Sequence, residues 1–228
     1  MPGAGTDKTR NWIETPGPIV ILVEPQLGEN IGAAARVMAN FGLKRLRLVK
    51  PRDGWPNIQA QRSASGADRI LDDATLFDTV EAAIADCTLA LAATARAHDQ
   101  AKPVLGPHEA ASFLAPHVAA GENVAVLFGR ERYGLENHEV ALADRIVTFP
   151  INPAFASLNL AQAVALVAYE WFKLASGGAL PFTMPQKSKP AGKQQVQAFF
   201  ANLEHQLDLI EYFRPAKATG KARAAALK

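Results

Sequence analysis

The stretch PINPAFASLNLAQAVALVAYEW (residues 150–171) runs from a polar loop into a long apolar helix without a break. From Leu158 onward, small and apolar side chains recur at helical spacing, and Ser157 stands where the N-cap of that helix is expected. The residue three positions after Ser157 is Leu160, so the sequence predicts no capping box there. A polar loop at a helix N-terminus can direct backbone N–H groups and a hydroxyl at a ligand. An ordinary capped core helix explains the same pattern, so the interpretation depends on the rest of the chain.

Apolar runs that precede this stretch alternate with helical patterns. Ile19–Val23 (IVILV) is typical of a strand that is buried on both faces. Asn30 is expected to be the N-cap of a helix that ends near Phe41, with Gly42 just beyond it. Further strands are predicted at 46–49, 88–93, 124–128 and 146–149, with an edge strand near 76–77. This alternation predicts an α/β domain with a parallel sheet and right-handed crossovers.

Polar loops follow several of these strands. They come after Val23, Phe128 and Phe149, and a further candidate follows Ala93. Ligands of open parallel sheets bind beyond the carboxyl ends of the strands. We therefore expect these loops to meet in one site.

The composition excludes several kinds of protein. The chain has 228 residues, of which 49% are hydrophobic, a formal net charge of +2 and one cysteine, Cys87. One cysteine allows neither an internal disulfide nor a cysteine-built metal site, and the five histidines lack metal-ligand spacing. No G-x-G-x-x-G or G-x-x-x-x-G-K motif follows a strand. Since no apolar run reaches the length of a membrane span, we expect a soluble cytoplasmic protein without metal.

The segments outside the apolar core are predicted from their composition. Residues 1–17 are expected to be a disordered leader, 18–176 the α/β domain, and 177–192 a Gly/Pro/Lys linker. Residues 193–213 predict an amphipathic helix. Residues 214–228 form a basic tail without an acidic residue; such tails are usually only solvated, but they also suit a phosphate backbone.

Two segments hold charged residues with functional potential. Arg36 lies about two turns into the first helix, and its side chain should lean back over Gly32 and Ala33, where small residues leave room for a substrate. A surface ion pair explains Arg36 equally well. In GRERYGLEN, Gly129 allows either a ligand or another backbone to come close. Glu131 either orients a neighbouring arginine or simply pairs with Arg130.

Three segments together resemble a known family. NIGAAARVMANFG (30–42), VAVLFGRERYGLEN (124–137) and FPINPAFASLNLAQAVALVAYE (149–170) resemble the three motifs of the SpoU (TrmH-like) branch of the SPOUT methyltransferases. The resemblance covers about residues 19–213. The second and third segments are most similar to members that methylate the ribose 2′-OH of the first anticodon-loop nucleotide of tRNA, a cytidine or uridine. His138 departs from the Glu that those members often carry, and residues 92–95 lack their usual serine.

The resemblance implies a fold, a cofactor and partners. It implies a SPOUT (α/β-knot) domain with a deep trefoil knot, S-adenosylmethionine as the methyl donor, tRNA as the substrate, and a homodimer. The small residues Ala161, Ala165 and Ala168 suggest a dimer surface on the last helix of that domain. By the family pattern, the cofactor would be held by Ala93, Thr94, Ala95, Gly129, Phe149, Ala156, Ser157 and Leu158. The methyl-transfer site would comprise Arg36, Asn30, Glu131, Ser157 and Asn159.

The chemistry expected from the resemblance needs alignment more than acid–base power. A sulfonium is already a good leaving group, and orientation alone can supply roughly 7–11 kcal/mol. A guanidinium is a poor base at neutral pH, so Arg36 is expected to hold the 2′-oxygen and an adjacent phosphate. The phosphate or water would then take the proton. Methylation of rRNA or of another tRNA position, and a non-catalytic RNA-binding role, remain as alternatives.

Overall fold

The computed structural model describes residues 12–96, 101–180 and 190–212. The chain divides into two compact units, Met1–Ala179 and Leu180–Lys228, and each is described by itself. In the described parts of the chain, no helix is both long enough and apolar enough to cross a membrane.

The first unit is built on one parallel sheet, as the alternating pattern predicts. In the described residues the sheet has seven strands in the order β3-β2-β1-β6-β4-β7-β5, and all its pairings are parallel. The sequence missed the short edge strand β5. The strands are β1 Ile19–Val23, β2 Leu46–Val49, β3 Thr75–Phe77, β4 Leu89–Ala93, β5 Val104–Leu105, β6 Val124–Phe128 and β7 Arg145–Val147.

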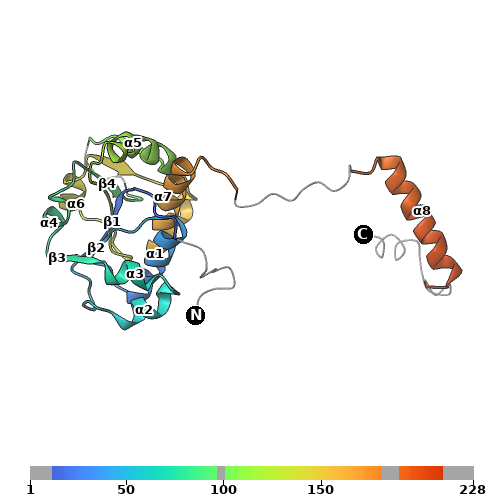
Figure 1. The fold of residues 1–228 in the computed structure, drawn as a ribbon, viewed down its shortest axis with the longest axis horizontal. Coiled ribbons are helices and arrows are strands. Elements are labelled where there is room, and N and C mark those ends of the chain that lie inside the picture. Colours follow the sequence, from blue (N-terminus) through green and yellow to red (C-terminus); the bar gives the residue numbers. More distant parts are fainter. Residues whose placement is uncertain (1–11, 97–100, 181–189, 213–228) are drawn as a thin grey trace. The chain divides into compact units, whose positions relative to one another are not determined.

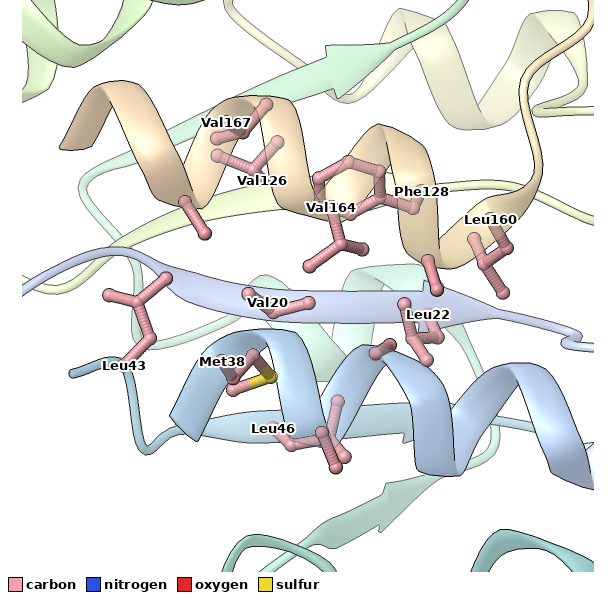
Figure 2. Close-up of a cluster of buried hydrophobic side chains, with 14 of the residues drawn as sticks. Val20, Leu22, Met38, Leu43, Leu46, Val126, Phe128, Leu160, Val164 and Val167 are labelled. Atoms are coloured by element: carbon pink, nitrogen blue, oxygen red, sulfur yellow. The ribbon is translucent and has the colours of Figure 1, made fainter. Parts of the chain in front are cut away.

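Helices cover both faces of this sheet (Figure 1). Strand β1 shows why two layers are needed, because Val20 and Leu22 enter one buried cluster while Ile21 enters the other. The first cluster lies between the sheet and helices α1 and α7 (Figure 2). The helices of this unit are α1 Gly28–Asn40, α2 Ile58–Ala64, α3 Asp68–Asp72, α4 Val80–Ile84, α5 Pro107–Ala119, α6 Asn137–Ala141 and α7 Leu160–Ala175, with a 3₁₀ turn, η1, at Pro153–Phe155.

Part of the predicted disordered leader is attached to the domain. The backbone N–H of Thr15 donates to the carbonyl of Gly42 at 3.0 Å, and the indole N–H of Trp171 donates to the carbonyl of Pro16 at 3.2 Å. Glu14 forms ion pairs with Lys44 and Arg69. The ordered domain therefore begins several residues before Pro18, and residues 1–11 lie outside the described residues.

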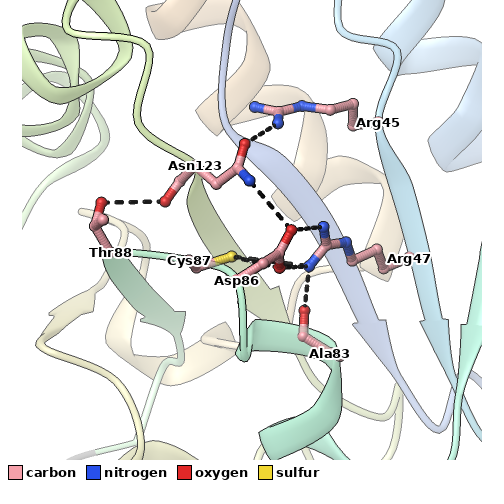
Figure 3. A network of polar contacts seen from close by, with 7 residues as sticks. All are labelled: Arg45, Arg47, Ala83, Asp86, Cys87, Thr88 and Asn123. Atoms are coloured by element: carbon pink, nitrogen blue, oxygen red, sulfur yellow. Dashed lines mark hydrogen bonds and ion pairs between the residues drawn. The ribbon is translucent and has the colours of Figure 1, made fainter.

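A polar network joins four segments at the amino edge of the sheet (Figure 3). The guanidinium of Arg47 donates to both carboxylate oxygens of Asp86, at 2.5 and 2.7 Å. Asn123 donates to Asp86 at 3.1 Å and accepts from Arg45 at 2.6 Å. The hydrogen bond from Arg47 lowers the pKa of Asp86 to about 2, while burial raises the pKa of the neighbouring Cys87 to about 11. These groups fasten the edge opposite the predicted site.

The predicted dimer surface on α7 is wrong at two of its three residues, Ala161 and Ala168, whereas Ala165 is partly exposed. Ala161 and Ala168 are 7% and 0% exposed and lie in the core of their own chain. Small side chains at these positions let α7 pack closely on the sheet and on α1. Large apolar or aromatic side chains that α7 does leave exposed include Leu166 at 39% and Tyr169 at 49%.

The second unit contains the helix that the amphipathic pattern predicts. It is α8, Lys193–Leu209, and none of its residues is buried. Most of the predicted linker and the whole basic tail lie outside the described residues. The trefoil knot implied by the resemblance stays a prediction.

Candidate active site

The loops at the carboxyl edge of the sheet enclose one pocket of about 350 Å³. It lies where the loops after β4, β6 and β7 meet, in front of the N-terminus of α7. The pocket wall includes every residue that the resemblance assigns to the cofactor, namely Ala93, Thr94, Ala95, Gly129, Phe149, Ala156, Ser157 and Leu158. The structure therefore brings together three segments that are far apart in the sequence.

Glu131 lies in this wall and connects it to helix α1. Its carboxylate accepts from the backbone N–H groups of Gln26 and Leu27, at 2.7 and 3.1 Å. It also accepts from the side-chain amide of Asn30 at 2.8 Å. The carbonyl oxygen of Asn30 in turn accepts from the amide of Asn159 at 2.8 Å. A continuous chain of hydrogen bonds thus joins the first helix, the loop after β6 and the start of α7.

Both predicted helix caps are wrong. Helix α1 begins at Gly28, so Asn30 lies inside it and points toward Glu131. The carboxylate of Glu131 reaches the start of α1 from another loop and accepts from the N–H groups of Gln26 and Leu27, a contact that a local sequence pattern cannot reveal. At α7 the N-cap is Asn159, whose side chain accepts from the N–H of Ala161, and Gln162 closes a capping box. Ser157 caps nothing and lies exposed in the pocket wall.

The structure places Arg36 outside this pocket. Its side chain is exposed on α1 and donates to the hydroxyl of Ser65 at 3.3 Å. The expected space over Gly32 is filled by helix α2, since a Cβ on Gly32 would lie 2.1 Å from both the carbonyl of Ala60 and the hydroxyl of Ser63. Gly32 is therefore required by helix packing, and it leaves no room there for a substrate.

The loop after β6 is held by Arg130, whose side chain is 10% exposed. Its guanidinium donates to Glu24 at 2.9 Å and to both oxygens of Glu139 at 3.0 and 3.1 Å. Burial alone would lower the pKa of Arg130, but these two carboxylates outweigh it and raise that pKa. In the described residues Glu131 neither bonds to a neighbouring arginine nor pairs with Arg130, because its carboxylate bonds to the start of α1. Position 129 requires a glycine because the backbone of Gly134 approaches it closely: a Cβ at Gly129 would lie 2.2 Å from the carbonyl carbon of Gly134.

Sequence reasoning missed several residues of the pocket wall. Arg96 and Arg132 bring two cations to it, and Tyr133 brings a half-exposed aromatic ring. The guanidinium of Arg132 lies 5.4 Å from the centre of that ring. Tyr133 and Arg132 stand in the segment GRERYGLEN, so their closeness to Glu131 in sequence was the available signal.

The pocket can hold a ligand with one apolar part and one polar part. Phe128, Phe149, Leu158 and Leu160 supply apolar surface, which suits a flat aromatic base. Glu131, Ser157 and the two cations supply hydrogen-bonding groups on the same wall. Within the described ranges, no group of three or more His, Cys, Asp or Glu side chains could hold a metal ion. The apolar and polar groups of the wall suit binding and orientation of a ligand.

Comparison with known proteins places this site in a family. The model of the SpoU rRNA methylase family matches residues 17–169. The tRNA (cytidine/uridine/adenosine-2′-O-)-methyltransferase TrmJ of Pseudomonas aeruginosa is 37% identical over 208 residues, which are 87% of this chain and 80% of that protein. The crystal structure of TrmJ from Z. mobilis ZM4 is 48% identical, covers 92% of this chain and 88% of its own, and superposes with a TM-score of 0.66.

A more distant solved structure concerns the 2-OH methylation of C/U34 on tRNA. It is 25% identical, covers 72% of this chain and 99% of its own, and superposes with a TM-score of 0.57. The family match spans both the sheet and all the loops that form the pocket. This chain therefore belongs to the SpoU rRNA methylase family.

Proposed function

We propose that this protein transfers a methyl group from S-adenosylmethionine to the ribose 2′-OH of the first anticodon-loop nucleotide of tRNA. The observation that carries the proposal is the pocket at the carboxyl edge, whose wall includes residues of the second and third family segments, with Asn30 of the first segment bonded to Glu131 of that wall. The names of the similar TrmJ proteins support tRNA as the substrate and ribose as the acceptor. We accordingly assign the protein to the cytoplasm, where tRNA is modified.

The residues of the pocket fit S-adenosylmethionine. Small side chains at Ala93, Ala95 and Ala156 leave the loop backbones accessible to the cofactor, and the apolar wall suits its adenine. When bound, the cofactor supplies an electrophilic methyl group on a sulfonium. Phe149 and Leu158 would hold the adenosine, whereas Thr94 and Ser157 would hold its polar groups.

The protein side chains would orient the acceptor ribose. Ser157 is exposed in the pocket and is not used as a helix cap, so its hydroxyl can bind the ribose or the methionine end of the cofactor. Asn159 donates to Asn30, which in turn donates to Glu131 and so fixes the position of its carboxylate. Such fixed polar groups lower the reorganisation needed at the moment of transfer.

We further propose that the enzyme is a homodimer and that each chain supplies Arg36 to its partner's pocket. Arg36 lies outside the pocket of its own chain. Helix α7 exposes Leu166 and Tyr169, and the ring of Tyr169 packs edge-on to Phe41 with 5.8 Å between the ring centres. An apolar surface of this kind on α7, beside Phe41 at the end of α1, fits a second copy of the chain.

The test is methyl transfer to defined RNAs. Purified protein with S-adenosylmethionine is incubated with total tRNA and, separately, with rRNA, and the modified nucleotide is mapped by nuclease digestion and mass spectrometry. Since 2′-O-methylation blocks alkaline cleavage at its own nucleotide, a protected bond at the first anticodon-loop position is the expected result. Methylation of rRNA alone would refute the tRNA assignment.

Another nucleotide of the anticodon loop is the second candidate target. It is favoured by the similarity to the solved structure concerned with C/U34. The mapping experiment separates the two positions. Transcripts with cytidine, uridine or adenosine at the modified position then measure base preference, since the name of the Pseudomonas aeruginosa relative includes adenosine.

A further inference from the structure

The loop KPRDGWPN (residues 50–57) connects β2 to α2, and its backbone is firmly anchored. The N–H of Lys50 donates to the carbonyl of Phe77 at 3.1 Å, and the N–H of Arg52 donates to the carbonyl of Pro25 at 3.1 Å. A turn is closed between Gly54 and Pro51, also at 3.1 Å. Since the loop follows a strand end, it lies at the same edge of the sheet as the pocket.

This loop contacts the segment that binds Glu131. Pro25, which accepts from Arg52, directly precedes Gln26, whose N–H donates to Glu131 at 2.7 Å. At the other end of the loop, Asn57 packs against Gly28, because a Cβ on Gly28 would lie 2.1 Å from the side-chain oxygen of Asn57. The position of Arg52 relative to Glu131 is therefore fixed by backbone contacts.

The side chain of Arg52 is half exposed and is held by its own neighbour. Its Nε and Nη2 donate to the two carboxylate oxygens of Asp53, at 2.8 and 3.1 Å. This bond to Asp53 raises the pKa of Arg52, and the charge of Glu131 contributes in the same direction. Two parallel donors of this kind match two oxygens of a phosphate group as well as those of a carboxylate.

The Arg52–Asp53 ion pair does not hold separate elements of the fold together. The ion pair of Arg47 with Asp86 joins β2 to the loop before β4, and that of Arg69 with Glu14 joins α3 to the N-terminal segment. Asp53, in contrast, is adjacent to Arg52 in sequence, so their pair links no separate elements. Exposed ion pairs contribute little to the free energy of unfolding. A phosphate can therefore replace Asp53 as the partner of Arg52 with little loss of stability.

We propose that Arg52 binds a phosphate of the RNA backbone beside the reactive ribose, and that Asp53 occupies its guanidinium until that phosphate displaces it. The proposal rests on the proposed function, because it concerns the same RNA. It makes Arg52 a positioning residue and Asp53 an internal competitor. The two residues should therefore affect RNA binding in opposite directions.

The experiment measures binding of an unmodified tRNA transcript to the full chain by fluorescence anisotropy, at salt concentrations from about 50 to 200 mM. Arg52→Ala should raise Kd about tenfold at low salt and reduce the slope of log K against log salt by about one. The Kd of Arg52→Lys should lie between those of the unaltered protein and Arg52→Ala, since lysine keeps the charge but lacks the paired donors. Asp53→Asn should lower Kd a few-fold and should leave the Tm and the affinity for S-adenosylmethionine unchanged.

The matched control is the pair of Arg69 and Glu14 at the opposite edge of the sheet. Arg69 is exposed to the same degree as Arg52, 56% against 53%, and is also paired with a carboxylate. Arg69→Ala and Glu14→Gln should leave the salt slope unchanged. If the pair has only a structural role, Arg52→Ala and Asp53→Asn should either both weaken tRNA binding or both leave Kd and the salt slope unchanged. Either result would overturn the inference.

The proposed function is checked in the same series by methyl transfer to tRNA. If the unaltered protein methylates tRNA, but Arg52→Ala keeps its Kd and salt slope and Asp53→Asn keeps its Kd, only the role of Arg52 is refuted. If the unaltered protein methylates no tRNA, the proposed function fails, and the inference fails with it.

Discussion

The side-chain amide of Asn159 donates to the side-chain oxygen of Asn30 at 2.8 Å, across 129 residues of sequence. Asn159 also caps α7, and Asn30 also donates to Glu131. The start of the last helix of the domain is therefore tied to the first helix and, through Asn30, to Glu131 in the pocket wall. A change at this contact should affect stability and methyl transfer together.

Substitutions of Asn159 and Ser157 should distinguish an effect on stability from an effect on methyl transfer. Asn159→Ala removes the α7 cap and should reduce the free energy of unfolding by about 0.5–2 kcal/mol, with a loss of activity. Ser157→Ala should leave the free energy of unfolding unchanged and reduce kcat about 100-fold, because an exposed hydroxyl that caps nothing holds no structure. Urea unfolding and methyl transfer to tRNA check both.

Gln162→Ala is the control, since it opens the capping box but leaves the contact with Asn30 in place. It should lose a little stability and keep its activity. A clear destabilisation by Ser157→Ala would show that the hydroxyl supports the fold and would contradict its assignment to the substrate.

Gly32→Ala tests whether the space beside Arg36 belongs to the substrate or to the fold. The added methyl group would press on Ala60 and Ser63 of α2, so the variant should lose about 1–3 kcal/mol of stability. Its affinity for S-adenosylmethionine, measured by calorimetry below its Tm, should be unchanged. A stable variant that fails to bind RNA would restore the substrate interpretation of Gly32.

The sequence predicted the elements that depend on local pattern. β1 has an apolar residue at every position, which indicates a strand buried on both faces, and its side chains do divide between two cores. The strand ends also predicted three of the loops that line the pocket, whereas the loop after Val23 does not line it and is connected to it only through Glu131. The cap of α7 was misassigned although Asn159 and Gln162, three residues apart, form a capping box that a local pattern contains. The cap of α1 failed because Glu131 reaches the start of α1 from a loop more than a hundred residues away. No local rule contains such a contact.

The partners of the charged residues could not be predicted from the sequence either. Arg130 and Glu131 are neighbours in sequence, yet one bonds to Glu24 and Glu139 and the other to the start of α1. Which partner each charge finds depends on how the loop folds over the sheet. The alanines of α7 were misassigned for a similar reason, because small residues suit tight packing inside a chain as well as between chains.

Asp86→Asn should weaken the protein only where Asp86 is ionised. The pKa of Asp86 is lowered to about 2 in the folded protein from 3.8, so its contribution to stability is present above about pH 4 and is lost as the pH falls through about 2. Because the side chain is 52% exposed, the contribution is reduced by solvent to less than about 1 kcal/mol.

Urea unfolding of the original protein and of Asp86→Asn at several pH values between 2 and 7 measures this contribution. The two unfolding curves should converge toward pH 2 and differ by a constant amount above pH 5. Arg47→Ala should remove the same pH dependence, since it deletes the partner that lowers the pKa. A difference that persists unchanged at pH 2 would show that the contact does not depend on charge.

Mixed dimers test whether Arg36 acts in the pocket of the partner chain. Arg36→Ala and Ser157→Ala should each abolish most methyl transfer when assayed alone. If Arg36 crosses the interface, a mixed dimer holds one pocket with both residues intact, and an equal mixture should recover about a quarter of the original activity. If Arg36 acts in its own chain, every pocket of the mixed dimer lacks one residue and nothing is recovered. Adding Leu166→Glu to both chains, which places a charge on the exposed face of α7, should prevent the recovery and yield monomers in sedimentation.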